Sequence, residues 1–273
     1  MRRYPRWVIG GVIILALGAV TLGQLTRGRG DDGTLEHVQA TGELRVGLDA
    51  SFPPFESLDA NGNIVGFDPD LARAIAGKLG AEPVFVNIGF DGLYDALLAD
   101  RVDVIISGLP YDPRRTRDVN YSQSYFNAGQ VLVVRADDTA FALSSDIPSE
   151  GRSMPDLLAG RVVGVEWGSL ADMEARRLKQ DAEGIQTIPQ PTAQDALNAL
   201  VAGQVDAAIA DAVSAYQFMG ESDKGVRIAE VLTDEPYVMA TRIKSRRLAD
   251  AIDVALAELH ESGMLDSLGA KWF

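Results

Sequence analysis

Residues 96–106 read ALLADRVDVII and residues 199–209 read ALVAGQVDAAI, and the two stretches align without a gap. Each contains an amphipathic segment, a short polar turn and an apolar run of the length of a buried strand. A second pair, LRVGLD at 44–49 and RVVGVE at 161–166, precedes the first pair in both halves and places Gly47 opposite Gly164. The sequence therefore predicts two similar α/β units with a ligand crevice between their strand ends.

Around these repeats, short apolar strands alternate with amphipathic helices, which favours α/β layers with a mostly parallel sheet. The predicted strands are 44–48, 84–88, 102–107, 162–166, 205–210 and 237–241, and the predicted helices are 69–79, 92–99, 170–179, 193–202 and 247–262. Residues 57–66 predict a hairpin with Asn61-Gly62 at its turn, and Asp68 is a candidate cap for the helix that begins at Pro69. Residues 135–160 are predicted to be an irregular surface segment.

The N-terminus carries an export signal. Arg2, Arg3 and Arg6 precede an apolar run of 17 residues from Trp7 to Gly23. This layout is typical of a secretory signal or an uncleaved signal anchor, and about 17 residues is the lower limit for a spanning helix. A polar, glycine-rich linker, residues 24–34, follows it. The protein is expected to be extracytoplasmic, either secreted or anchored by residues 7–23, and the sequence leaves cleavage of this helix open.

Charge and composition exclude several classes of site. The net charge is −14, and five of the 25 basic residues, but none of the 39 acidic ones, lie before residue 31. A body this acidic repels nucleic acid, so no nucleic-acid partner is predicted. Cysteine is absent, and the two histidines, His37 and His260, are far apart in the chain. Disulfides and a lipid-carrying cysteine are therefore excluded, and neither a metal site nor a cofactor is predicted.

Two stretches after predicted strands in the first unit carry groups suited to a small polar ligand. Ser107–Arg117 (SGLPYDPRRTR) offers backbone N–H groups and then Arg115, whose guanidinium could grip a carboxylate through two parallel hydrogen bonds. Asp49–Glu56 (DASFPPFE) places two phenylalanines around two prolines, and Phe90 has a comparable position after the next strand. A phenyl face beside a crevice can stack on a ligand, although core packing is the alternative for Phe55.

The second unit offers a carboxylate and a helix start. Asp211 follows the strand at 205–210, where it could pair with an ammonium group or cap the helix after it. Gly168-Ser169 opens a helix, and the free N–H groups there favour an anion.

Seven stretches cover most of residues 43–273: LRVGLDASFPPFES (44–57), GNIVGFDPDLARAIAGKLG (62–80), GLYDALLADRVDVIISG (92–108), DPRRTRDVNYSQSYFNAGQVLVV (112–134), AGRVVGVEWGS (159–169), AGQVDAAIADAVSAY (202–216) and LAELHESGMLDSLGAKWF (256–273). In this order they resemble the polar amino-acid family of bacterial periplasmic solute-binding proteins. The resemblance implies an α/β fold of two lobes joined by two hinge strands, preceded by an N-terminal membrane or signal helix.

The resemblance also implies domain boundaries. Residues 1–34 would be the signal peptide or signal anchor with its linker, residues 35–127 and 237–273 lobe 1, and residues 128–236 lobe 2. The chain would cross between the lobes near Tyr125–Gly129 and return near Glu235–Tyr237. Ligand binding would close this hinge.

By motif position, the resemblance assigns roles in ligand binding. Arg115 would hold the ligand α-carboxylate, and Asp211 of the other lobe would pair with the α-ammonium. Phe52 and Phe90 would form aromatic walls, and Asp49 would face the variable side chain. Backbone groups in two segments would complete the carboxylate site, namely those of Ser107, Gly108 and Leu109 and those of Ser169 and Leu170.

Two residues depart from the family pattern. Pro110 stands where the family usually has Ser or Thr, and it removes a hydroxyl and a backbone N–H from the carboxylate site. Trp167 stands where a smaller residue or glutamine is usual, and it could narrow the pocket or pack within its lobe. With Asp49 and Glu56 near the mouth, a cationic or zwitterionic ligand is preferred.

The predicted function is capture of a small zwitterionic solute, an amino acid, for delivery to an ABC importer. A second hypothesis is an enzyme, because cyclohexadienyl dehydratases resemble these proteins and Asp49, Glu56 or Glu166 could supply an acid. A third is the ligand-sensing domain of a signalling receptor. Since the sequence shows neither a nucleophile–base constellation nor a phosphate loop, the chain is predicted to be a binding protein without catalytic residues. Its partners would be the importer permease and, if the first helix is retained, the membrane.

Overall fold

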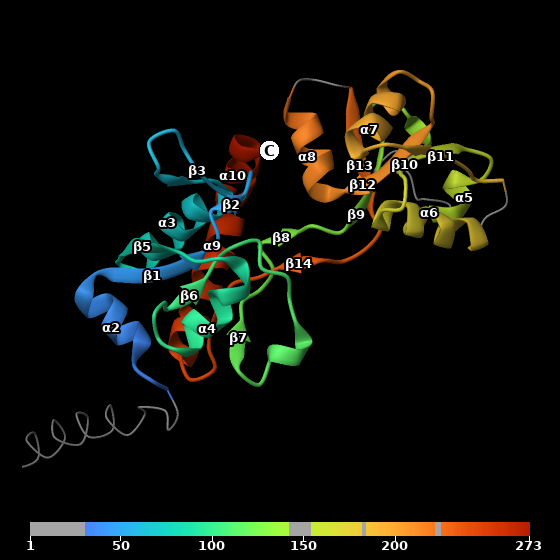
Figure 1. Ribbon diagram of the computed structural model, residues 1–273. Helices are drawn as coiled ribbons and strands as arrows, with labels where there is room; N and C mark the ends of the chain where they lie inside the picture. The colour runs from blue at the N-terminus through green and yellow to red at the C-terminus, as the bar shows by residue number, and fades with distance from the viewer. Residues whose placement is uncertain (1–30, 142–153, 182–183, 222–224) are drawn as a thin grey trace, which may run out of the picture.

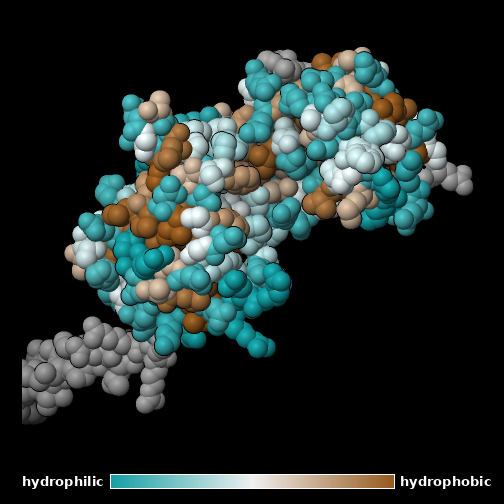
Figure 2. All heavy atoms as spheres, viewed as in Figure 1, coloured by the Kyte–Doolittle hydropathy of each residue, from teal (hydrophilic) through white to brown (hydrophobic). Residues whose placement is uncertain are grey.

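The computed structural model describes residues 31–141, 154–181, 184–221 and 225–273, which form two α/β lobes joined by two extended segments (Figure 1). This confirms the predicted fold class. The predicted helix at 7–23 and the middle of the segment predicted to be irregular lie outside the described residues. Within the four described ranges, no helix is both long enough and apolar enough to cross a bilayer. Figure 2 shows hydrophilic side chains over most of this face of both lobes, with separate hydrophobic patches among them.

Lobe 1 is built on a five-stranded mixed sheet in the order β5-β1-β6-β15-β7. The strands β5, β1 and β6 are parallel, and β15 runs antiparallel to β6 and β7. The strands and helices are β1 (Glu43–Leu48), β5 (Glu82–Asn87), β6 (Val104–Ile105), β7 (Val119–Tyr121), β15 (Ala240–Arg242), α2 (Thr34–Thr41), α3 (Phe67–Leu79), α4 (Leu93–Leu98), α9 (Arg246–Glu261) and α10 (Met264–Trp272), with the 3-10 helices η1 (Phe90–Gly92) and η2 (Pro113–Arg115).

A small antiparallel sheet, β2-β3-β4, stands beside this main sheet. Its strands are β2 (Ser51–Phe52), β3 (Glu56–Leu58) and β4 (Ile64–Val65). The turn between β3 and β4 contains Asn61-Gly62, and Gly62 has a φ of 80°, which glycine adopts at little cost. The hairpin predicted at 57–66 is confirmed.

Lobe 2 repeats the plan with the order β11-β10-β12-β9-β13. Here β11, β10 and β12 are parallel, and β9 runs antiparallel to β12 and β13. The elements are β9 (Gln130–Arg135), β10 (Val162–Glu166), β11 (Gln186–Gln190), β12 (Ala207–Asp211), β13 (Val226–Val231), α5 (Met154–Leu158), α6 (Leu170–Asp181), α7 (Ala193–Val201) and α8 (Ala212–Gly220), with the 3-10 helix η3 (Thr139–Phe141). The segment predicted to be irregular thus contains the end of β9, η3 and α5.

The two lobes are connected by paired strands. β8 (Phe126–Asn127) lies on the outward path and β14 (Pro236–Tyr237) on the return path, and they pair antiparallel. Figure 1 shows both segments crossing between the lobes side by side. They lie within the two predicted crossings, whereas the residue boundaries predicted for the lobes stay predictions.

Matching hydrogen bonds occur at equivalent positions of the two repeats. The amide of Arg45 in β1 donates to Asp103 Oδ2 at 3.0 Å, and the amide of Val162 in β10 donates to Asp206 Oδ2 at 2.9 Å. The repeat alignment pairs Asp103 with Asp206 and Arg45 with Val162. The sequence similarity therefore reflects the same local structure in both lobes.

The paired glycines also share a function in packing. A Cβ atom on Gly47 would lie 3.2 Å from the side chain of Val102, and one on Gly164 would lie 3.3 Å from that of Val205. Both valines precede the strand that lies beside the glycine, β6 or β12. The missing side chain allows close packing of the neighbouring segment in each lobe.

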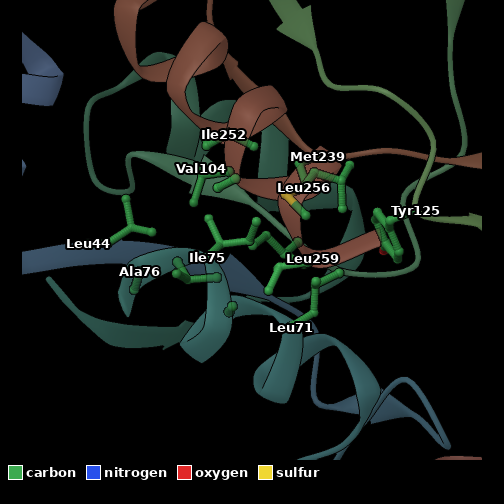
Figure 3. Close-up of a cluster of buried hydrophobic side chains, with 14 of the residues drawn as sticks. Leu44, Leu71, Ile75, Ala76, Val104, Tyr125, Met239, Ile252, Leu256 and Leu259 are labelled. Carbon is green, nitrogen blue, oxygen red and sulfur yellow. The ribbon is translucent and has the colours of Figure 1, made fainter. Parts of the chain in front are cut away.

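Each sheet is covered on both faces, because alternate side chains of a strand point to opposite faces. Val104 and Ile106 belong to a cluster with α3, α9 and α10, whereas Ile105 belongs to the cluster with α4. Figure 3 shows part of the first cluster, where Ile75 of α3 meets Leu259 of α9. In lobe 2 one cluster contains α7 and α8 and another contains α5 and α6. Each lobe therefore has its own core.

Two local predictions were wrong, and one C-terminal helix was missed. Asp68 does not cap a helix; it lies inside α3, which begins at Phe67 with Gly66 as its cap, and its side chain is fully buried. The strand predicted at 237–241 is divided into β14 in the hinge and β15 in lobe 1. The helix α10 was not predicted. Its apolar residues pack against α3 and α9, a contact that no local pattern shows.

Candidate ligand site divided between two lobes

A cavity of about 310 Å³ opens at the carboxyl ends of β1 and β6 in lobe 1. Its lining includes five of the predicted site residues, namely Asp49, Phe52, Phe90, Ser107 and Gly108. Of the other four lining residues, Pro110 was predicted to stand in the carboxylate site and Glu56 near the mouth, whereas Ser51 and Tyr237 were not predicted. The cavity therefore combines aromatic walls with acidic and hydroxyl groups.

The aromatic wall is held by close packing. The ring of Phe52 stacks on that of Phe55, with centroids 5.3 Å apart and an interplanar angle of 9°. Gly108 has a φ of 48°, and a Cβ atom there would lie 3.0 Å from the Phe52 ring. Phe55 is fully buried, so the core packing considered for it is correct. Glycine at 108 lets the loop approach the aromatic wall closely.

Asp49 organises the mouth of this cavity. Its Oδ1 accepts a hydrogen bond from the Ser51 hydroxyl at 2.7 Å, and its Oδ2 accepts one from the Phe90 N–H at 2.8 Å. The carboxylate thus joins the turns after β1 and β5 and places negative charge beside both phenyl rings. Such a site suits a cation.

Behind the floor, two carboxylic acids hold the Ser107–Gly108 loop. The Ser107 hydroxyl donates to Glu56 Oε1 at 2.6 Å, and the Gly108 N–H donates to Asp68 Oδ2 at 2.6 Å. Burial raises the pKa of Glu56, and the neighbouring Asp68 charge raises it further. Burial also raises the pKa of Asp68, opposed by hydrogen bonds from Gly108, Glu56 and Tyr125.

A second cavity, of about 190 Å³, opens at the carboxyl ends of β10 and β12 in lobe 2. It is lined by three predicted residues, Ser169, Leu170 and Asp211, and by Gln130, Glu166, Ala171, Ala193 and Ala210. Asp211 Oδ1 accepts from the Ser214 N–H at 2.8 Å and so caps α8. Asp211 can therefore cap the helix and also pair with an ammonium group, the two roles considered from the sequence. Its other carboxylate oxygen has no hydrogen bond within the described ranges.

The α6 N-terminus forms one side of this second cavity. The Ser169 hydroxyl donates to the Glu166 carbonyl at 2.8 Å and accepts from the Asp172 N–H at 3.3 Å. Leu170 begins the helix and is exposed. Since the serine hydroxyl is already engaged, only backbone groups here would be free for an anion.

Arg115 lies beside the lobe 1 cavity and is not among the residues that line it. Its guanidinium lies over the Tyr94 ring, 4.1 Å from the centroid, and no ion pair of Arg115 occurs within the described residues. Tyr94 lines an adjacent cavity that shares Phe90 and Pro110 with the first. The structure thus places a guanidinium that makes no ion pair with a described residue beside the adjacent cavity, and its binding role stays a prediction. By contrast, Arg114 is exposed and bonded to Asp112.

Three further predicted positions, Leu109, Pro110 and Trp167, differ in where their side chains lie. Leu109 packs its side chain in a hydrophobic cluster, so only its backbone could serve the site as predicted. Pro110 forms a bridge with Tyr237 and lines the cavity, so it stands in the site as the resemblance implies. The Trp167 side chain is 74 % exposed, so packing within its own lobe is excluded.

Both cavities adjoin the paired hinge strands. On the lobe 1 side, the Tyr111 N–H donates to the Pro236 carbonyl at 3.0 Å, next to the Pro110–Tyr237 bridge. On the lobe 2 side, the Ala212 N–H donates to the Gly129 carbonyl at 2.9 Å, and Asp211 pairs with Gln130 in the sheet. Rotation about these strands would therefore change the separation of the two cavities.

The pKa of Tyr237 responds to acidic groups of both lobes. Its pKa is raised to about 12, first by burial and then by the charges of Glu235, Asp211, Asp68 and Glu56. Asp211 belongs to lobe 2, whereas Asp68 and Glu56 belong to lobe 1. Tyr237 therefore lies within range of acidic groups from both lobes.

The site residues that sequence reasoning missed differ in how visible they were. Glu166 was named from the sequence only as a possible acid of an enzyme; the internal repeat, which pairs it with Asp49, could have indicated it as a lining residue. Gln130 and Tyr237 had no such signal. They reach the site through antiparallel pairing with residues far along the chain.

Two lobes with separate cores, a paired-strand hinge and one half-site on each side define a two-lobed solute-binding protein. Residues 44–273 match the bacterial extracellular solute-binding proteins of family 3, and the chain belongs to that family. It is therefore an extracytoplasmic binding protein.

Named relatives agree with this assignment. The arginine-binding extracellular protein ArtP of Bacillus subtilis is 30% identical over 85% of this chain and 86% of its own length. A crystal structure of a mutant of ArgBP from T. maritima is 38% identical, covers 88% of this chain and 98% of its own, and has a TM-score of 0.51. The matched family and these relatives are binding proteins, which supports the prediction that the chain is not an enzyme.

An enzyme also shares this fold. The crystal structure of an ancestral cyclohexadienyl dehydratase is 24% identical over 87% of this chain and 95% of its own, with a TM-score of 0.72. At this identity the likeness shows the fold alone, so the dehydratase hypothesis gains no support from it.

Proposed function

We propose that this protein binds an amino acid with a cationic side chain between its two lobes and delivers it to an ABC importer. The observation that carries the proposal is the division of complementary groups between two cavities that adjoin one hinge. Lobe 1 offers backbone N–H groups, the neighbouring Arg115 guanidinium and acid-flanked aromatic walls, and lobe 2 offers Asp211. A zwitterion is matched only when both halves meet.

In this proposal the α-carboxylate lies against the Ser107–Gly108 loop and Arg115, and the α-ammonium pairs with Asp211. The variable side chain lies between Phe52 and Phe90, where the Asp49 carboxylate favours positive charge. The relatives named for arginine binding support a cationic side chain. Residues 7–23 would hold the protein at the membrane if they are retained.

A melting-temperature screen tests the proposal. Because the ligand binds only the folded protein, a concentration of 100 times Kd adds about 2.7 kcal/mol to the free energy of unfolding. Arginine, lysine and histidine should raise the melting temperature more than glutamate, which serves as the control of opposite side-chain charge. If no amino acid raises the melting temperature, the proposed ligand class is wrong.

Replacing Asp49 with asparagine should weaken binding of arginine about tenfold and leave binding of citrulline, its neutral isostere, within about threefold. Asparagine keeps an acceptor for the Phe90 N–H, so the turn is retained while the charge is lost. Calorimetric titration of both ligands into both proteins measures the difference. If the affinities for arginine and citrulline fall equally, Asp49 supports the turn and does not distinguish a charged ligand side chain from a neutral one.

A further inference from the structure

Glu56 of β3 and Asp68 of α3 are buried together directly behind the floor of the lobe 1 cavity. Both side chains are 0 % exposed. Each carboxyl lies close enough to the other to change its pKa, and among the described residues no lysine or arginine is a main cause of either pKa shift. Two ionised carboxylates buried side by side and without a neighbouring cation would be strongly unfavourable.

The hydrogen bonds around the pair leave a place for one proton. Glu56 Oε1 accepts from Ser107, whose hydroxyl oxygen accepts from the Asp49 N–H at 3.0 Å. Asp68 Oδ2 accepts from the Gly108 N–H and from the Tyr125 hydroxyl, at 2.6 and 3.0 Å. Of the four carboxyl oxygens of this pair, Glu56 Oε2 and Asp68 Oδ1 have no hydrogen-bond donor within the described residues. If one of these two oxygens carries a proton, it can donate a hydrogen bond to the other, so that neither is left without a partner.

We propose that Glu56 and Asp68 share a single proton and act as positioning residues, which hold the Ser107–Gly108 loop in the conformation that receives the ligand carboxylate. The inference rests on the proposed function, because it assigns that loop to ligand binding. One proton keeps one negative charge, instead of two, behind the ligand carboxylate. Since Tyr125 directly precedes β8, the same pair also connects the loop to the first hinge strand.

Two substitutions at Glu56 test whether a protonated, hydrogen-bonded side chain at this position holds the Ser107–Gly108 loop. In Glu56→Gln the amide can accept from Ser107 and donate to Asp68, so arginine should bind within about threefold of wild type. In Glu56→Ala both bonds are lost, and affinity should fall at least about tenfold. A tenfold loss in Glu56→Gln would mean that the ionised form is needed, and wild-type affinity in Glu56→Ala would mean that the pair does not position the loop; either result overturns the proposal.

Infrared spectroscopy detects the proton directly and does not depend on ligand binding. The wild-type protein at neutral pH should show the carbonyl stretch of a protonated carboxylic acid, and Glu56→Gln should lack it. Glu174→Gln is the matched control, because Glu174 is also buried but is ion-paired with Arg177 at 2.6 Å. That variant should retain the band. Absence of the band from the wild type overturns the proposal, even if Glu56→Ala fails to fold.

The pH dependence of stability provides a further readout. The groups facing the Glu56 carboxyl are Asp68 of α3, Ser107 after β6 and the Asp49 charge after β1, while Tyr125 and Tyr237 complete the buried surroundings. The pKa of Glu56 lies above its ordinary 4.5 in the folded protein. Its contribution to stability is therefore full below that value and is lost as the pH rises toward the folded pKa.

The folding equilibrium constant of wild type relative to Glu56→Gln should therefore fall between about pH 5 and pH 9, by up to about tenfold per pH unit for one proton. A ratio that stays constant or rises contradicts the shared proton. If the wild type binds no amino acid while the infrared band and this pH dependence are present, the proposed function fails and the carboxyl pair stands. If the wild type binds but the band is missing, the reverse holds.

Discussion

Replacing Arg115 with alanine should raise the dissociation constant of the bound amino acid by about tenfold to about 150-fold. A hydrogen bond to a charged group contributes on the order of 1.5–3 kcal/mol, and each 1.4 kcal/mol is about a factor of ten in affinity. Within the described part of the chain Arg115 makes no ion pair, although its charge helps to lower the pKa of Asp112, and its guanidinium lies over the Tyr94 ring. The stacking leaves the N–H groups at the edge of the guanidinium available for a carboxylate.

Two further variants distinguish a carboxylate clamp from general positive charge. Arg115→Lys keeps the charge but not the planar fork, so its affinity should lie between those of wild type and Arg115→Ala. Arg117→Ala removes an exposed arginine two residues away and should bind like wild type. Calorimetry or tryptophan fluorescence measures all three. Wild-type affinity in Arg115→Ala would exclude its role in holding the carboxylate.

Replacing Phe55 with alanine should lower the free energy of unfolding by about 3–5 kcal/mol, as is usual for a buried phenylalanine. Phe55 is fully buried, and its ring contacts those of Phe52, Phe67, Phe126, Tyr237 and Phe273, with centroids 5.0–6.0 Å apart. Phe126 lies in β8, Tyr237 in β14, and Phe52 in the aromatic wall of the cavity. One side chain thus supports the wall and both hinge strands.

Phe90→Ala is the matched control for this prediction. Phe90 is 45 % exposed, so its loss should change the free energy of unfolding by less than about 1 kcal/mol while weakening ligand binding. Denaturation in urea without ligand measures stability, and titration of the folded variants measures affinity. If Phe55→Ala is no less stable than Phe90→Ala, the aromatic cluster does not carry the stability assigned to it.

Much of the fold could be predicted because its signals are local. The stripe Leu71, Ala72, Ile75, Ala76 and Leu79 predicts α3, and all five side chains are buried. The pairing of Gly47 with Gly164 across the repeat predicts two lobes, and both glycines lie against a valine of the neighbouring segment. Such patterns depend only on the period of a helix or strand and on close packing between adjacent elements.

Less of the candidate site could be predicted. Asp49, Phe52, Phe90 and the Ser107–Gly108 loop were identified because each follows a strand at the same sheet edge, and they line one cavity. Arg115 follows the same edge but stacks on Tyr94 beside that cavity, a contact made by a side chain from α4. Whether these residues touch the ligand stays a prediction.

The sequence by itself determined two repeated α/β units, their main strands and helices, the crossing points and the family resemblance. Only the tertiary structure decided that Asp68 is a buried acid and not a helix cap, that Glu56 is its partner, and that Tyr237 and Gln130 join the site. The physical reason is the distance along the chain over which each kind of interaction acts. Periodicity and turn chemistry act over a few residues, whereas burial, hinge pairing and the sharing of a proton depend on neighbours that folding brings from distant parts of the chain.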